Sequence, residues 1–137
     1  MTMTVLVTGG GGYIGSVLVR MLLNKGYKVR VLDRFFFGKE SLKDVESKLE
    51  LVKDDVRWVD PSILEGIDVI IDMAALSNDS AGALDQSKTL EINHLGRVRM
   101  AMLGKNKGVK RYILASSCSV YGFQGGLLDE HSKTNPL

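Results

Sequence analysis

Residues 4–16 read TVLVTGGGGYIGS, and this stretch decides the fold that the rest of the chain must follow. The apolar run at 4–8 is rich in β-branched residues and ends at a glycine, which is typical of a buried strand. Four consecutive glycines follow at positions 9–12. Apolar side chains then recur at helical spacing, at Ile14, Val17, Leu18, Met21 and Leu22. The stretch therefore predicts a strand, a glycine-rich turn and an amphipathic helix in direct succession.

Three glycines in this stretch have separate physical roles. Gly9 permits the tight turn, Gly12 lets the backbone approach a phosphate closely, and Gly15 lets the helix pack against the strand. The free N–H groups and the positive end of the helix dipole favour a pyrophosphate at this point. A loop of the P-loop class would carry Lys-Ser or Lys-Thr after the glycines, but Ser16-Val17 stands there. A dinucleotide site is thus preferred over a merely flexible turn.

Asp33 ends the next predicted strand, residues 27–33, and stands eighteen residues after Gly15. That is close to the separation expected for the acid that binds the adenosine ribose. A carboxylate there accepts hydrogen bonds from both ribose hydroxyls and repels a 2′-phosphate. We therefore expect NAD rather than NADP, although the neighbouring Arg34 softens the repulsion.

The rest of the chain alternates strands with helices. Strands are predicted at 27–33, 49–55, 68–75 and 111–116, and helices at 41–49, from Pro61, and at 84–105. Such alternation predicts right-handed βαβ units and a parallel sheet that is covered on both faces. We expect an α/β fold with a doubly wound, Rossmann-type sheet of about five strands in residues 1–137, with ligands at the carboxyl ends of the strands. Residues after 116 are expected to form a loop.

Two local signals concern helix ends. Gly26 is placed for a left-handed cap after the first helix. Ser41 and Asp44 have the spacing of a capping box, which supports a helix at 41–49.

Two apolar clusters allow more than one role. The consecutive Phe35, Phe36 and Phe37 either cover the adenine end of a cofactor or pack against the next helix. On the long helix, apolar side chains share one face, and we expect its methionines to be core or subunit-interface residues. Leu95, Val98 and Met102 lie on that face, and the methionines concerned are Met100 and Met102.

Composition excludes several classes of protein. The chain has 137 residues, a formal net charge of +2, 45% hydrophobic residues and 25% charged residues, which is typical of one globular domain. The basic residues are scattered, so neither nucleic acid nor a membrane surface is an expected partner. With one cysteine, Cys118, and two histidines outside any ligand spacing, we expect no internal disulfide and no metal site. Without a leader-like apolar segment, we expect a cytoplasmic protein.

Six motifs, in order along the chain, resemble those of the extended short-chain dehydrogenase/reductases, and within them the NAD-dependent nucleotide-sugar epimerases and dehydratases. They are TGGGGYIGS (8–16), VLDRFFFG (31–38), DDVR (54–57), DMAALS (72–77), EINHLG (91–96) and ASSCSVYG (115–122). Together they are specific to the superfamily, but not to one sugar or one reaction. The resemblance implies bound NAD, a nucleotide-sugar substrate and transient hydride transfer at the sugar C4.

The resemblance also implies roles for single residues around the cofactor. Tyr13 and Ile14 would lie at the pyrophosphate turn, and Asp33 and Arg34 would hold the adenosine ribose. Asp55 and Val56 would flank the adenine. The path of the nicotinamide ribose would be lined by Met73, Ala74, Ala75 and Ser77.

Two further positions carry a family role by resemblance. Asn93 matches the asparagine that holds helix and strand backbones in register near the cofactor. Ser117 stands four residues before Tyr121, where the family keeps its catalytic serine or threonine. Its hydroxyl would hydrogen-bond the sugar oxygen that is oxidised and assist the proton relay of a tyrosine.

One family motif has no match in these residues. The family's general base is the tyrosine of a Tyr-x-x-x-Lys motif, in which the lysine lowers the pKa of the phenol. Four positions beyond Tyr13, Tyr27, Tyr112 and Tyr121 stand Val17, Val31, Ser116 and Gly125. We therefore expect residues 1–137 to be an incomplete NAD-binding domain, the front half of a longer enzyme with a separate substrate lobe. Loss of a general base costs about 10²–10⁴-fold in rate, so we expect the chain alone to be inactive.

The reaction type stays open among related possibilities. Cys118 and Ser119 follow Ser117 where dehydratases of the family usually carry an acidic pair, which favours epimerase-like chemistry. The alternatives are an NAD(P)-dependent reductase or dehydrogenase of the same superfamily, and a non-catalytic module that binds or senses NAD. By resemblance, the helix at 84–105 would also join a homodimer interface.

Overall fold

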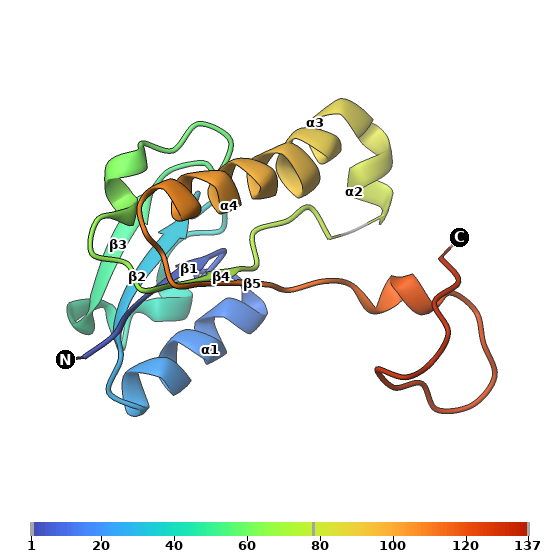
Figure 1. Ribbon diagram of the computed structural model, residues 1–137, viewed down its shortest axis with the longest axis horizontal. Coiled ribbons are helices and arrows are strands. Elements are labelled where there is room, and N and C mark those ends of the chain that lie inside the picture. The colour runs from blue at the N-terminus through green and yellow to red at the C-terminus, as the bar shows by residue number, and fades with distance from the viewer. Residues whose placement is uncertain (1, 78, 137) are drawn as a thin grey trace.

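The computed structural model describes residues 2–77 and 79–136, and within them the strands form one five-stranded sheet (Figure 1). The strands are β1 (Thr4–Thr8), β2 (Lys28–Asp33), β3 (Leu49–Lys53), β4 (Val69–Asp72) and β5 (Arg111–Leu114). They lie in the order β3-β2-β1-β4-β5, and every neighbouring pair is parallel. The chain winds outward from β1 in one direction and then in the other, which confirms the predicted doubly wound, Rossmann-type fold.

Helices cover both faces of the sheet. The helix α1 (Tyr13–Asn24) lies on one face and α4 (Arg97–Asn106) on the other (Figure 1). Ahead of α4 run α2 (Asp79–Leu84), α3 (Gln86–Leu90) and the π-helical segment Glu91–Gly96. Single 3₁₀ turns occupy Glu40–Leu42, Glu46–Lys48, Pro61–Leu64 and Cys118–Tyr121. None of the helices in the two described ranges has the length and apolar character needed to cross a membrane.

The central strand β1 is buried on both faces, as expected of a parallel sheet between two helical layers. Leu6 is fully buried in the cluster under α4, with Ile70 and Met100. Val7, on the other face, is fully buried in the cluster under α1, with Val19. Each face of β1 therefore anchors one of the two hydrophobic cores.

The helix α1 approaches β1 so closely that only glycine fits at the contact. A Cβ atom on Gly15 would lie 2.2 Å from the carbonyl oxygen of Gly9. In the turn between them, a Cβ on Gly10 would lie 2.7 Å from Cγ1 of Val31 on β2. Gly9 itself has a φ of 69°, in the left-handed region that favours glycine. The predicted roles of Gly9 in the turn and Gly15 in the packing therefore agree with the geometry.

A buried polar network joins the carboxyl ends of β1 and β4 to the side chain of Tyr112 on β5. Asp72 is only 1% exposed, and its carboxylate accepts hydrogen bonds from the hydroxyls of Thr8 (2.5 Å) and Tyr112. The Thr8 hydroxyl oxygen also accepts hydrogen bonds from the backbone N–H groups of Met73 and Ala74, both at 3.0 Å. A buried carboxylate is tolerated because each oxygen has a donor.

The helix expected at 41–49 does not form, and that prediction was wrong. Two 3₁₀ turns stand there instead, and the supposed capping residues have partners elsewhere. The Ser41 hydroxyl donates to the carbonyl oxygen of Gly11 at 2.8 Å, and Asp44 forms an ion pair with Arg20 on α1. Contacts with the glycine turn and α1 thus override the local capping signal, while Leu42 is fully buried.

The helix expected at 84–105 is interrupted. Asp85 lies between α2 and α3, and its side chain accepts a hydrogen bond from the N–H of Lys88 at 2.9 Å, which begins a new helix. Elsewhere the differences are smaller. Three predicted strands end two or three residues early, the helix expected from Pro61 is a 3₁₀ turn, and Gly26 has the expected left-handed φ of 81°.

The long helix packs against the sheet with a different face from the one that carries most of its apolar side chains. Leu95, Val98 and Met102 do share a face, but they are 53%, 44% and 61% exposed. The sheet is met by a row that includes two glycines, because a Cβ on Gly104 would lie 2.8 Å from Cδ1 of Ile70. That row consists of Ile92, Gly96, Met100 and Gly104, all buried. Met100 is therefore a core residue, and Met102 is a surface residue.

Gly15→Ala should destabilise the chain by more than about 2 kcal/mol, because its Cβ would meet backbone atoms that cannot move without shifting β1 or α1. The matched control is Gly125→Ala, whose Cβ would have no heavy atom within 4 Å. We expect the control to stay within about 0.5 kcal/mol of wild type in urea unfolding. Equal free energies of unfolding for both variants would contradict the packing described for α1.

The Tyr112 hydroxyl should make stability fall at alkaline pH. Burial, together with the hydrogen bond to Asp72, raises the pKa of Tyr112 above its ordinary value near 10. Above that pH the unfolded chain loses this proton while the folded chain keeps it, so the free energy of unfolding decreases as the pH rises. The difference in unfolding free energy between wild type and Tyr112→Phe should be constant from about pH 7 to 9 and then shrink. A difference that stays flat to about pH 11 would show that the phenol is not held as described.

Candidate dinucleotide-binding site

The glycine turn leads into α1 with its first N–H groups free of helical partners. The N–H of Gly12 bonds the carbonyl oxygen of Gly9 at 3.1 Å, and the first helical bond runs from Ser16 to Gly12 at 2.9 Å. Helix geometry leaves the N–H groups of Tyr13 and Ile14 without a carbonyl one turn earlier. Their side chains are 92% and 66% exposed.

The space beside this turn fits a phosphate. A Cβ on Gly12 would meet only the Gly9 carbonyl oxygen, at 3.3 Å, so nothing else crowds that side of the backbone. The free N–H groups and the positive end of the α1 dipole both favour an anion there. The residues present therefore fit the pyrophosphate of a dinucleotide.

Asp33 is tied to this turn by its carboxylate. Oδ2 accepts a hydrogen bond from the N–H of Gly11 at 2.9 Å, and Oδ1 accepts one from the N–H of Phe35 at 2.8 Å. Each oxygen keeps a further lone pair, so the carboxylate is held in place and still able to accept from two ribose hydroxyls. The carboxyl end of β2 is thus coupled to the turn after β1.

The three phenylalanines after Asp33 divide between two environments. Phe35 is 8% exposed and packs in the core cluster that contains Leu42, with a φ of 49° that is uncommon for a residue with a side chain. Phe36 and Phe37 are 77% and 94% exposed. The packing role therefore applies to Phe35, while cover of an adenine remains a prediction for the other two.

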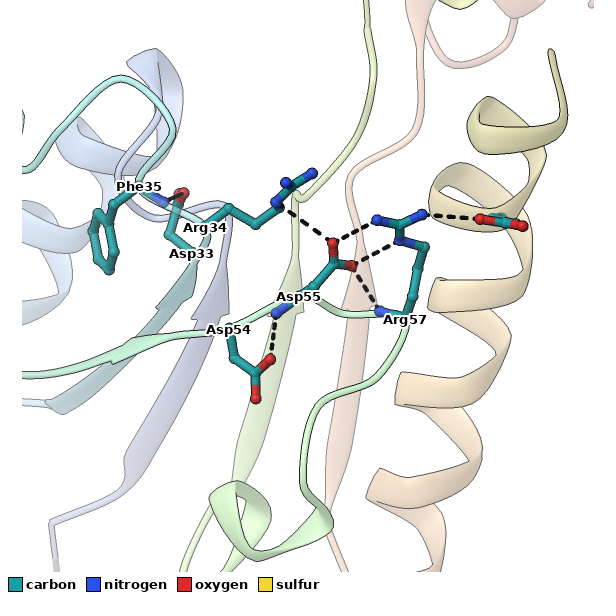
Figure 2. A network of polar contacts seen from close by, with 7 residues as sticks. Asp33, Arg34, Phe35, Asp54, Asp55 and Arg57 are labelled. Atoms are coloured by element: carbon teal, nitrogen blue, oxygen red, sulfur yellow. Dashed lines mark hydrogen bonds and ion pairs between the residues drawn. The ribbon is translucent and has the colours of Figure 1, made fainter. Parts of the chain in front are cut away.

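A cluster of four charges lies beyond the carboxyl ends of β2 and β3 (Figure 2). Asp55 accepts hydrogen bonds from Arg57 through Nη2 (2.8 Å), Nε (3.0 Å) and the backbone N–H (3.0 Å). Arg57 also donates to Glu91 at 2.9 Å, and the Nε of Arg34 lies 3.5 Å from Oδ2 of Asp55. The bonds from Arg57 hold the pKa of the Asp55 carboxyl below its usual value.

Two members of this cluster were not predicted from the sequence. Arg57 belongs to the DDVR motif, but its bond to Glu91 spans 34 residues and no local spacing indicates it. The guanidinium of Arg57 also lies 5.4 Å from the ring centre of Trp58, within the range of a cation–π contact. Val56, between Asp55 and Arg57 in sequence, is buried in the core under α4.

The loop after β4 approaches the glycine turn from the other side. A Cβ on Gly9 would lie 3.0 Å from the backbone nitrogen of Ala74, and the Thr8 hydroxyl fixes Met73 and Ala74 as described above. Ala75 and Ser77 are exposed. The structure thus brings this loop, the glycine turn and Asp33 together along the carboxyl edge of the sheet.

Asn93 connects this loop to the helical layer. Its Oδ1 accepts a hydrogen bond from the N–H of Leu76, and its Nδ2 donates to the carbonyl oxygen of Leu76, both at 2.8 Å. Both ends of the amide are therefore engaged with backbone groups. A direct contact between Asn93 and a cofactor stays a prediction.

Ser117 follows β5, in the segment that runs away from the sheet (Figure 1). Ala115 still donates a backbone hydrogen bond to Asp72 at 3.0 Å, and Ser117 then begins the turn Cys118–Tyr121. Its exposed hydroxyl donates to that of Ser119 at 3.0 Å and accepts the Ser119 N–H at 3.1 Å.

Residues 2–77 and 79–136 contain no group of three or more histidine, cysteine, aspartate or glutamate side chains arranged to hold a metal ion. The single cysteine, Cys118, is exposed.

Known proteins resemble this chain in sequence and in fold. UDP-glucuronic acid decarboxylase 1 of Arabidopsis thaliana is 38% identical over 121 residues, which cover 86% of this chain and 27% of the relative. A putative UDP-glucose 4-epimerase of Methanocaldococcus jannaschii is 32% identical, with 97% of this chain and 45% of the relative covered. The solved structure of DesIV, a dTDP-glucose 4,6-dehydratase from Streptomyces venezuelae with NAD and TYD bound, superposes with a TM-score of 0.84 at 32% identity. That superposition covers 98% of this chain and 46% of DesIV.

The chain thus spans between about a quarter and just under half of the length of these relatives. The model of the NAD dependent epimerase/dehydratase family matches residues 5–137, which is nearly the whole chain. The glycine turn, the Asp33 carboxylate and the sheet, apart from its first residue Thr4, lie within that match. This chain belongs to the NAD-dependent epimerase/dehydratase family.

Proposed function

We propose that this chain provides the NAD-binding part, and one catalytic hydroxyl, of an enzyme that transiently oxidises the C4 position of a nucleotide sugar. The observation that carries the proposal is the Asp33 carboxylate, bonded to Gly11 beside the open N-terminus of α1. This arrangement accepts an adenosine ribose next to a pyrophosphate. Membership of the family supports the choice of NAD.

The chain's own residues divide the work of binding along the carboxyl edge. The N–H groups of Tyr13 and Ile14 would bind the pyrophosphate, and Asp33 would bind the adenosine ribose. The segment Asp55–Val56 would flank the adenine, and residues 73–77 would line the path of the nicotinamide ribose. NAD, when bound, supplies the hydride acceptor for the sugar and later returns the hydride.

The substrate and the outcome follow from the relatives and from one loop. The relatives named above act on UDP- or dTDP-linked sugars, which supports a nucleotide-sugar substrate here. Ser117 would hydrogen-bond the C4 oxygen as it is oxidised. Cys118 and Ser119 follow it without a carboxylate, so the loop offers no acid for a dehydration, and we favour epimerisation.

The general base is not among the tyrosines of this chain. None of the four is followed by lysine at the fourth position. Tyr112 is committed to Asp72, and its raised pKa is the opposite of what a general base needs. We therefore propose that the chain alone does not turn over a sugar. The same observation favours a second candidate function, a non-catalytic module that binds NAD.

The surroundings of the site suggest a partner and a compartment. The exposed apolar face of Leu95, Val98 and Met102 supports a homodimer interface on this helix. The exposed thiol of Cys118 is compatible with a reducing compartment, such as the cytoplasm.

NAD should bind to the purified protein, as measured by isothermal titration calorimetry. Asp33→Ala removes the acceptor of both ribose hydroxyls and should weaken binding at least about tenfold. Gly12→Val fills the side of the turn that a phosphate would approach and should have a similar effect. Asp44→Ala is the matched control, because that carboxylate is exposed and pairs with Arg20. Unchanged binding in both site variants would contradict a dinucleotide site at this edge.

The protein, supplied with NAD and UDP-glucose, should produce no 4-epimer above background, as followed by chromatography. Steady epimerisation would contradict the proposed lack of a base.

Sequencing the coding DNA past the codon for Leu137 distinguishes the two candidate functions, the enzyme and the NAD-binding module. An open frame that soon encodes Tyr-x-x-x-Lys supports the enzyme, and a stop codon supports the binding module.

A further inference from the structure

Arg34 stands where it could decide between NAD and NADP. It directly follows Asp33, and an arginine near that acid is the group that accommodates a 2′-phosphate in NADP-binding sites. Its side chain is 53% exposed and ends in a delocalised positive charge. Taken alone, it would offset the repulsion between the Asp33 carboxylate and a 2′-phosphate.

The side chain of Arg34 extends away from Asp33. Figure 2 shows it crossing toward Asp55, whereas the Asp33 carboxylate points toward the backbone of Phe35. The Nε of Arg34 lies 3.5 Å from Oδ2 of Asp55. The guanidinium is therefore paired with a different carboxylate from the one that would hold the ribose.

Asp55 is held rigidly enough to keep Arg34 in this position. Its side chain is only 14% exposed, and three hydrogen bonds from Arg57 fix both of its oxygens. The N–H of Asp55 donates to the carboxylate of Asp54 at 2.7 Å, which orients the start of the same loop. Arg57 is held in turn by Glu91 at 2.9 Å.

We propose that Asp55 is a specificity-determining residue that draws Arg34 away from the 2′ position of the adenosine ribose and so makes the site prefer NAD over NADP. This inference rests on the proposed NAD-binding function. Asp33 repels the 2′-phosphate directly, and Asp55 draws away the arginine next to it, whose charge would compensate. The contact is a single, partly exposed ion pair, so its contribution to the NAD/NADP ratio is about fivefold rather than many hundredfold.

The test is the ratio of the dissociation constants of NADP and NAD, measured by calorimetry on the same protein. Asp55→Asn keeps the shape of the side chain and removes the charge that holds Arg34. The ratio should move toward NADP by about fivefold. The ratio is the readout, because Asp55 also flanks the proposed adenine site and its replacement affects both nucleotides. Thermal unfolding of each variant checks that the loop is intact.

Two further variants assign the effect to Arg34. Arg34→Gln should change the ratio by less than about twofold in the wild-type background, and should abolish the fivefold gain in the Asp55→Asn background. Asp54→Asn is the matched control, since its side chain can still accept the N–H of Asp55 and makes no contact with Arg34. It should leave the ratio unchanged.

The outcomes separate this inference from the function on which it rests. A wild-type protein that binds neither nucleotide overturns the proposed function and the inference together. A protein that binds NAD, but whose ratio does not respond to Asp55→Asn, overturns the inference alone. A ratio that shifts equally in Asp54→Asn, or in Asp55→Asn without Arg34, also overturns it.

Discussion

The contact between the first turn of α1 and the end of β1 is the constraint on which the rest of the structure depends. Gly15 faces the Gly9 carbonyl oxygen with no room for a methyl group, so the helix begins directly on the central strand. The position of the helix start then follows from backbone geometry. Because Asp33 bonds Gly11, two residues before α1 begins, this one contact brings the proposed anion site and the proposed ribose site together.

The carboxyl edge is assembled by polar side chains that bond backbone groups of neighbouring segments. Asp33 bonds Gly11, Thr8 bonds the loop after β4, and Asn93 bonds Leu76. Each bond crosses from one strand or helix to the next, so the loops around the edge hold each other. A site built in this way is ordered before a ligand arrives, which lowers the entropic cost of binding.

The parts that sequence reasoning predicted are those with local causes. The strands followed from apolar runs, and α1 followed from spacing and from the glycines before it. The prediction of a helix at 41–49 was wrong because Asp44 pairs with Arg20 and Ser41 bonds Gly11. The spacing of residues along the sequence does not reveal a partner on another element. The row of the long helix that faces the sheet was not predicted, because its glycines have no apolar side chain to mark them in the sequence. Those glycines nevertheless permit the closest approach of the helix to the sheet. The hydrogen bond between Thr8 and Asp72 joins residues 64 positions apart, and the one between Arg57 and Glu91 joins residues 34 positions apart. Only the folded topology brings these pairs together.

The position of Trp58 gives the charge cluster an optical property. It is the only tryptophan in the chain, it is 69% exposed, and its ring lies against the Arg57 guanidinium. A stacked cation alters the surroundings of an indole, and the emission of an indole depends on those surroundings. The intrinsic fluorescence of this protein is therefore a single-site signal, and it originates one residue from the group that holds Asp55.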